Sequence, residues 1–231
     1  MAAPLWLAVA QGLTEEARQL LLGGANIEEA RAPHQTTPLQ AAVLCDGHQR
    51  HVEVVNLLLE HGALVTVTNN RGETPLHQAA YLGHEAVALL LLQHGADVKG
   101  KANGRTALHF AALGGHRAMA HLLLQQPSNV SAVDNVGMTA LHFAALKGHE
   151  EVVEVLIEHR ANVLAEDKDG CTAEDMATHQ SHLEVVAMLK AEAVSRAKCV
   201  AFAMGHHARL GKGSMVERLD PEVLRMVLKQ V

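Results

Sequence analysis

A segment of about 33 residues recurs along this chain, and this periodicity constrains the fold more than any other feature. The clearest copies are TPLHQAAYLGHEAVALLLLQHGADV from Thr74, TALHFAALGGHRAMAHLLLQQPSNV from Thr106 and TALHFAALKGHEEVVEVLIEHRANV from Thr139. Looser copies begin at Thr37 and Thr172, and a partial copy begins at Pro4. The successive threonines are 37, 32, 33 and 33 residues apart. A unit this short cannot bury an apolar face alone, so the copies must stack into an array.

Within one copy, the residue types predict two short helices joined by turns. Thr74 is a good N-cap, and Pro75 suits the first helical position that follows it. Gly83 predicts the end of the first helix in a left-handed cap. The stretch 85–92 predicts a second helix with a broad apolar face, and the polar segment 69–72 predicts an exposed turn before the unit. The core is therefore expected to consist of helices packed through Leu, Ala and Val.

The motif T-P-L-H-x-A-A-x-x-G-H, followed by a leucine pair and G-A-x-V, resembles the ankyrin repeat family. The resemblance covers residues 4–190 and six copies, starting near residues 4, 37, 74, 106, 139 and 172. It implies an all-α solenoid of helix-turn-helix units with finger-like turns. We expect residues 1–190 to form this repeat domain and residues 191–231 to form a helical segment that caps the array or acts as an adaptor. In that family the concave face usually binds a protein partner.

The copies depart from the motif at several places. Copy two carries about four extra residues near Cys45, and the turn before Thr106 is one residue short. Arg160 stands where glycine would close the second helix of copy five. Copy six has Glu174 and Asp175 in place of the leucine and histidine of the motif, which is typical of a terminal repeat that faces water.

Histidine is unusually frequent, and repeat geometry accounts for most of the 17 histidines. The histidines of the T-P-L-H motif are His77, His109 and His142, those that follow the glycine are His51, His84, His116, His149 and His182, and those near the end of the second helix are His61, His94 and His159. By resemblance to the family, the first set bridges the capping threonine and a loop backbone. We therefore expect a structural role for these imidazoles.

One cluster has ligand-like spacing, namely Cys45, His48 and His51. A tetrahedral zinc site needs a fourth ligand or a water, and no second Cys/His pair follows at fixed spacing. The chain also has no metalloprotease, nucleophile-elbow or phosphate-loop motif. We expect no metal, no cofactor and no catalytic residues, and we interpret the chain as a protein that is not an enzyme.

Charge and composition exclude further classes. The formal net charge is −6, whereas nucleic-acid binding needs clustered Lys and Arg. The longest purely apolar run, residues 86–92, is far too short to span a bilayer. Three widely separated cysteines argue against a disulfide framework. We expect a monomer in the cytoplasm, the nucleus or both, without nucleic-acid or membrane partners.

The concave face is the expected site of partner binding. By resemblance, the residues seven and eight positions after each threonine are exposed on the inner helix, and the fingertips flank them. The inner-helix candidates are Tyr81, Leu82, Leu113, Leu146 and Lys147, and the fingertip candidates are Asn70, Arg71, Glu73, Asn103, Arg105, Asn135 and Met138. Tyr81, Leu113 and Leu146 make an apolar row, which is typical of an interaction surface. The alternative is that these side chains pack under the fingers.

Charge is distributed unevenly along the chain. Residues 1–190 contain 12 basic and 21 acidic residues, and residues 191–231 contain 7 basic and 4 acidic ones. The glutamates Glu150, Glu151, Glu154 and Glu158 follow helical spacing. We interpret them as a solvated outer face; the alternative is a site for a basic partner.

The last residues suggest a second role for the tail. The string LDPEVLRMVLKQV resembles the opening of an F-box over 13 residues. The primary hypothesis is a non-catalytic module that binds a partner protein through the concave face. The alternative is an adaptor whose tail recruits a second partner, such as a ubiquitin-ligase subunit.

Overall fold

The computed structural model describes residues 5–32, 35–45, 49–126 and 128–210, with side chains placed up to residue 197 apart from those of residues 49 and 50. Over these residues the chain forms twelve α-helices and no strand, apart from four isolated β-bridges in the turns. The helices are α1 Leu5–Ala10, α2 Thr14–Leu22, α3 Pro38–Leu44, α4 Gln49–Glu60, α5 Pro75–Leu82, α6 Glu85–Gln93, α7 Ala107–Gly114, α8 Arg117–Gln125, α9 Ala140–Lys147, α10 Glu150–Glu158, α11 Ala173–His179 and α12 Leu183–Leu210. The expected all-α solenoid is confirmed.

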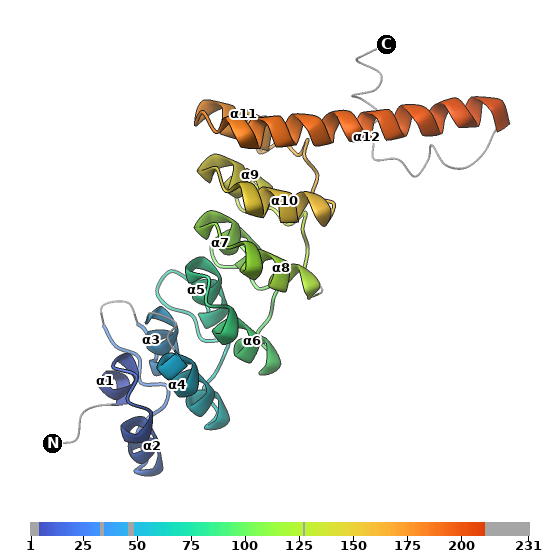
Figure 1. Cartoon of the computed structure of the whole chain (residues 1–231). Helices are drawn as coiled ribbons and strands as arrows, with labels where there is room; N and C mark the ends of the chain where they lie inside the picture. Colours follow the sequence, from blue (N-terminus) through green and yellow to red (C-terminus); the bar gives the residue numbers. More distant parts are fainter. Residues whose placement is uncertain (1–4, 33–34, 46–48, 127, 211–231) are drawn as a thin grey trace.

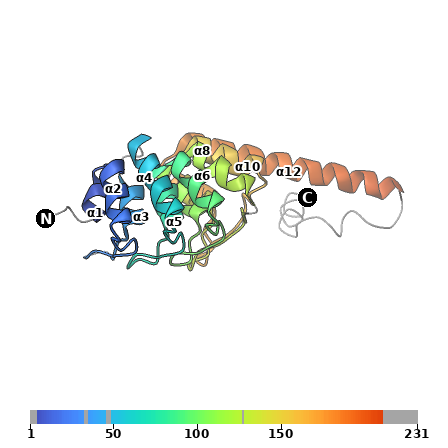
Figure 2. The ribbon, with the colours of Figure 1, turned by 90° about the horizontal axis from the view of Figure 1, so that it is seen from below.

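Consecutive helices pair into six units, and the units stack side by side into an elongated array (Figure 1). The fingers between units project together from one side of the helices (Figure 2). The core runs through the whole stack as one cluster dominated by Leu, Ala and Val, as the composition predicted. The paired alanines of the motif, such as Ala79 and Ala80, are completely buried, so neighbouring first helices approach closely.

The helix-capping residues predicted from the sequence lie at the helix ends where we expected them. Thr74 is the N-cap of α5, and a proline follows it at the start of the helix. Gly83 ends α5 in the left-handed conformation, with φ of 74°. Arg160 adopts the same region, with φ of 65°, although it is not a glycine. Copy five therefore keeps the left-handed turn after its second helix even though the favourable glycine is missing.

A histidine from each following unit fills the space beside the glycine that ends a first helix. A Cβ atom on Gly115 would lie 2.6 Å from the ring of His149. The His149 Nε2 atom lies 3.2 Å from the Leu113 carbonyl oxygen, so the ring donates a hydrogen bond across the boundary between units. His116 and His182 make the corresponding bonds to the carbonyls of the preceding units. The contact between neighbouring units therefore needs both a glycine, which leaves space for the ring, and a histidine, which fills that space.

The fingers before Thr74, Thr106, Thr139 and Thr172 fold in two ways. In most of them one Asx side chain closes the turn: Oδ1 of Asp134 accepts from the backbone N–H groups of Val136 and Met138, at 2.9 and 3.0 Å. The finger before Thr106 is one residue shorter, and there Asn103 and Gly104 take positive φ of 50° and 83°. Two consecutive positive φ values define a tight type I′ turn, for which Asn-Gly is the favoured pair. The short interval in the sequence thus corresponds to a different turn type.

The C-terminal helix α12 continues without a break from the last repeat into the segment that the sequence analysis separated at residue 190. In Figure 1 it extends well past the other helices. Its base is anchored, because Ala193 is buried and the Arg196 guanidinium donates to the Ala161 carbonyl at 2.9 Å. An ion pair of 3.6 Å joins Lys190 on α12 to Glu174 on α11, so it links the two helices of the last unit. Residues 211–231 lie outside the described residues, so capping by the tail stays a prediction.

Candidate protein-binding groove

A groove of about 400 Å³ lies on the concave side, between the ends of α3, α5 and α7 and the fingers that flank them. Its lining residues are Leu44, Arg71, Glu73, His77, Gln78, Tyr81, Leu82, Arg105, Phe110 and Leu113. The groove therefore spans copies two to four of the array. Its volume lies within the range of ligand pockets, and a groove of this volume can also hold one or a few side chains of a partner protein.

The groove gathers half of the twelve residues that the sequence predicted for partner binding. The six that line it are Arg71, Glu73, Tyr81, Leu82, Arg105 and Leu113. The other six, which are Asn70, Asn103, Asn135, Met138, Leu146 and Lys147, do not line it. Copies three and four thus contribute to one depression, and the candidates of copy five lie further along the array.

The apolar side chains of the groove are only partly covered. Tyr81 and Leu44 are each 49% exposed, and Leu82, Leu113 and Phe110 are half-buried. Leu44 was missed, although it lies seven residues after Thr37, as Tyr81 does after Thr74. Counting seven residues from Thr37 would have identified Leu44, but this count was not applied to the irregular second copy.

The charged side chains at the rim of the groove differ in whether they have a partner within the protein. The Arg71 side chain is exposed and has no hydrogen bond or ion pair within the described part of the chain. Its backbone carbonyl accepts from the Asn103 amide at 2.9 Å, so Asn103 joins two fingertips. The Glu73 carboxylate is held in its own finger by the Asn69 amide, also at 2.9 Å. Arg71 is therefore a rim cation available for a partner.

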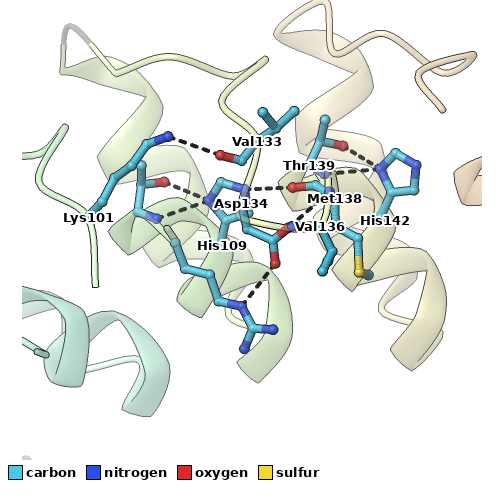
Figure 3. A network of polar contacts seen from close by, with 10 residues as sticks. Lys101, His109, Val133, Asp134, Val136, Met138, Thr139 and His142 are labelled. Atoms are coloured by element: carbon cyan, nitrogen blue, oxygen red, sulfur yellow. Dashed lines mark hydrogen bonds and ion pairs between the residues drawn. The ribbon is translucent and has the colours of Figure 1, made fainter. Parts of the chain in front are cut away.

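Arg105 has a structural role as well as a place in the lining. Its Nε donates to the buried Asp134 carboxylate at 3.2 Å, and its guanidinium lies over the Phe143 ring at 4.6 Å. Figure 3 shows Asp134 beside the backbone of its own finger, where the Val136 N–H donates to its carboxylate. Hydrogen bonds from Arg105 and from two backbone N–H groups lower the pKa of Asp134, despite the opposing effect of its desolvation.

The histidines of the T-P-L-H motif make the bridges expected from the family resemblance (Figure 3). Nδ1 of His109 accepts from the backbone N–H and the hydroxyl of Thr106, at 3.1 and 2.8 Å. Since a backbone N–H can only donate, the ring proton is on Nε2, which donates to the Met138 carbonyl at 3.2 Å. His77 and His142 repeat the pattern with the carbonyls of the next fingers. The structural interpretation of these imidazoles is confirmed.

Burial sets the charge state of the bridging histidines. Desolvation lowers the pKa of His109 from 6.5 to about 4, and it lowers the pKa of His77 and His142 in the same direction. Loop carbonyls that accept from these rings oppose the shift without cancelling it. The three rings are therefore neutral at physiological pH, as a ring that accepts at Nδ1 must be.

The remaining sequence hypotheses concern groups outside the groove. His48 lies outside the described residues, and across the described part of the chain no group of three or more His, Cys, Asp or Glu side chains could hold a metal ion. Glu150, Glu151, Glu154 and Glu158 are all exposed on α10, which agrees with a solvated outer face, and Glu154 pairs with Arg117 at 3.1 Å.

No helix of the described region is long and apolar enough to cross a bilayer.

Comparison with known proteins supports the repeat assignment. The family model for ankyrin repeats in three copies matches residues 55–134 and 121–197, and the single ankyrin repeat model matches residues 34–70. The ankyrin repeat protein YahD of Escherichia coli (strain K12) is 41% identical over 71 residues, which are 31% of this chain and 35% of that protein. The Notch-regulated ankyrin repeat-containing protein of Xenopus tropicalis is 36% identical over 88 residues, or 37% of this chain and 74% of that protein.

A third relative is much longer than the matched segment. The ankyrin repeat and SOCS box protein 16 of Mus musculus is 41% identical over 75 residues, which are 32% of this chain and 15% of that protein. The match to the E. coli relative also spans only about a third of that protein. These similarities therefore concern the repeats and not the rest of either protein.

Proposed function

Since the chain belongs to the ankyrin repeat family, whose repeats are generally protein-protein interaction modules, we propose that it binds a partner protein, without catalysis, through the concave groove between copies two and four. The binding residues we propose are those that line the groove. Tyr81, Leu82 and Leu113 would make the apolar centre, and Arg71 would contact the partner at the rim.

The observation that carries this proposal is a half-exposed apolar floor in a concave site. Tyr81 is 49% exposed and lies beside the partly covered side chains of Leu44, Leu82 and Leu113. Tyrosine and arginine dominate the binding energy of many interfaces, and they do so from central, desolvated pockets. The groove supplies both residue types within one depression.

The adaptor alternative depends on residues 211–231, which lie outside the described residues, so the proposal rests on the repeats.

Affinity capture with matched variants tests the proposal. Tyr81→Lys combined with Leu113→Lys should abolish recovery of the main captured protein from a cell lysate, because two charges would be desolvated in an apolar contact. Leu64→Lys is the control, since Leu64 is 53% exposed but does not line the groove. Capture would be quantified by mass spectrometry, and folding by circular dichroism and thermal melting.

Two results would contradict the proposal. If the double variant recovers the same proteins as the wild type, the binding site lies elsewhere on the chain. If the double variant melts far below the Leu64→Lys control, these side chains contribute to the core and their exposure does not mark a site.

A further inference from the structure

The floor of the groove contains a polar group that the fold itself does not satisfy. Gln78 is only 6% exposed, and its side-chain Oε1 is buried without a hydrogen-bond partner. Within the described part of the chain, neither end of this amide has a hydrogen bond to another residue. An unsatisfied buried acceptor costs on the order of 1–3 kcal/mol. A buried acceptor that is left unsatisfied in a folded protein therefore calls for an explanation.

The neighbouring copies show that the fold does not require glutamine at this position. Gln78 follows the T-P-L-H motif directly, and the corresponding residues of the next two copies are Phe110 and Phe143. Phe143 is 4% exposed, and Phe110 packs against the core. An apolar side chain thus fits at this position. Gln78 instead places an amide without a hydrogen-bond partner for its oxygen in the groove.

We infer that the Gln78 amide pairs with the main chain of an extended peptide segment of the partner, in which a large apolar residue stands beside an acidic one. This inference rests on the function proposed above and specifies the chemistry of the partner at that site. A peptide group offers one N–H and one C=O, which are the complements of the oxygen and nitrogen of a side-chain amide. Rotation of the amide by half a turn exchanges its two ends, so Gln78 can meet the peptide in either direction.

The surroundings of Gln78 select the side chains of that segment. Tyr81, Leu82, Leu113 and Leu44 leave an apolar space next to the amide, which suits one large aliphatic or aromatic residue. Arg71 on the rim has a free guanidinium, whereas the Glu73 carboxylate is held by Asn69. A carboxylate on the peptide can therefore form a charge-assisted hydrogen bond with Arg71.

The test uses the full chain and a display library of random 12-residue peptides. Peptides enriched on the wild-type protein should share a large apolar residue adjacent to Asp or Glu. Gln78→Met, which nearly conserves volume, should weaken their binding about tenfold, because the peptide group loses its partner. The same variant should melt at the wild-type temperature or above it, since it removes an unsatisfied polar group. A role limited to folding would lower the melting temperature instead.

Matched controls separate the amide and the charge from nonspecific effects. Gln93→Met makes the same substitution at an exposed site on α6 and should leave peptide binding unchanged. Arg71→Glu should weaken binding about tenfold or more, and added salt should weaken the wild-type interaction. Lys99→Glu makes the same change of charge at an exposed residue that does not line the groove and should have little effect.

The outcomes distinguish this inference from the proposed function. Peptides that bind Gln78→Met and Arg71→Glu as tightly as the wild type would overturn the inference, and so would a library that yields no binder. If such unaffected peptides are still lost with Tyr81→Lys and Leu113→Lys, the groove is a binding site of different chemistry. If they bind that double variant too, the proposed function fails as well.

Discussion

The bridging histidines should make the stability of the array depend on pH, and His109 allows the size of the effect to be worked out. Its pKa falls from 6.5 in the unfolded chain to about 4 in the folded one. The unfolded chain therefore binds a proton first as the pH falls, and the folded state loses stability through this window. With these two values, the contribution of His109 falls by about 2 kcal/mol between about pH 7.5 and about pH 5.

The variant His109→Gln isolates this contribution. Copy two already carries glutamine at the same position: Gln40 accepts from the Thr37 N–H at 3.1 Å and donates to the Glu73 carbonyl at 3.0 Å. Glutamine thus keeps the bridge but cannot take up a proton. Urea unfolding at several pH values should show a flatter pH dependence for His109→Gln, by about 2 kcal/mol over this range.

The reverse substitution provides the matched control. Gln40→His adds a titrating ring in the same kind of environment, so it should steepen the pH dependence. If His109→Gln and the wild type lose stability in parallel as the pH falls, the imidazole is not held neutral by burial. The reasoning from its hydrogen bonds would then be refuted.

Two further predictions concern the packing of the repeats. Gly115→Ala should lower the melting temperature, by a free energy on the order of 1–3 kcal/mol, because φ is 77° there and the new Cβ would meet the His149 ring; an unchanged melt would mean that this boundary relaxes freely. Truncation after Lys190 should also lower the melting temperature, because it removes the bond from Arg196 to the Ala161 carbonyl; a truncated protein that melts at the same temperature and stays monomeric would indicate a tail independent of the array.

The sequence predicted the repeat architecture well because its signals are local and are repeated in register. Thr74 caps a helix, and Gly83 ends it with the left-handed turn expected of it. Each copy contains similar signals, so a weak indication in one copy is reinforced by the others. The histidine bridges were expected from the resemblance to the ankyrin repeat family, because their partners lie in the next finger.

What the sequence did not reveal depends on contacts between copies. Arg105 and Asp134 are 29 positions apart in the sequence, and no local sequence pattern indicates that they form an ion pair. The unsatisfied amide of Gln78 could be recognised only once the neighbouring side chains were in place. From the sequence, we placed a domain boundary at residue 190 because the repeat pattern ends there. Helix α12 nevertheless continues past this residue.

The histidine-to-carbonyl bonds described for the boundaries between units imply that the array is not equally strong along its length. At the first boundary, the histidine of copy two, His51, has both ring nitrogens buried without a partner in the described structure. The thiol of Cys45 instead contacts the Ala10 carbonyl oxygen at 3.4 Å, and a thiol is a weak donor. Fraying should therefore start at copy one, and the groove, which begins at copy two, would keep its shape while that end opens and closes.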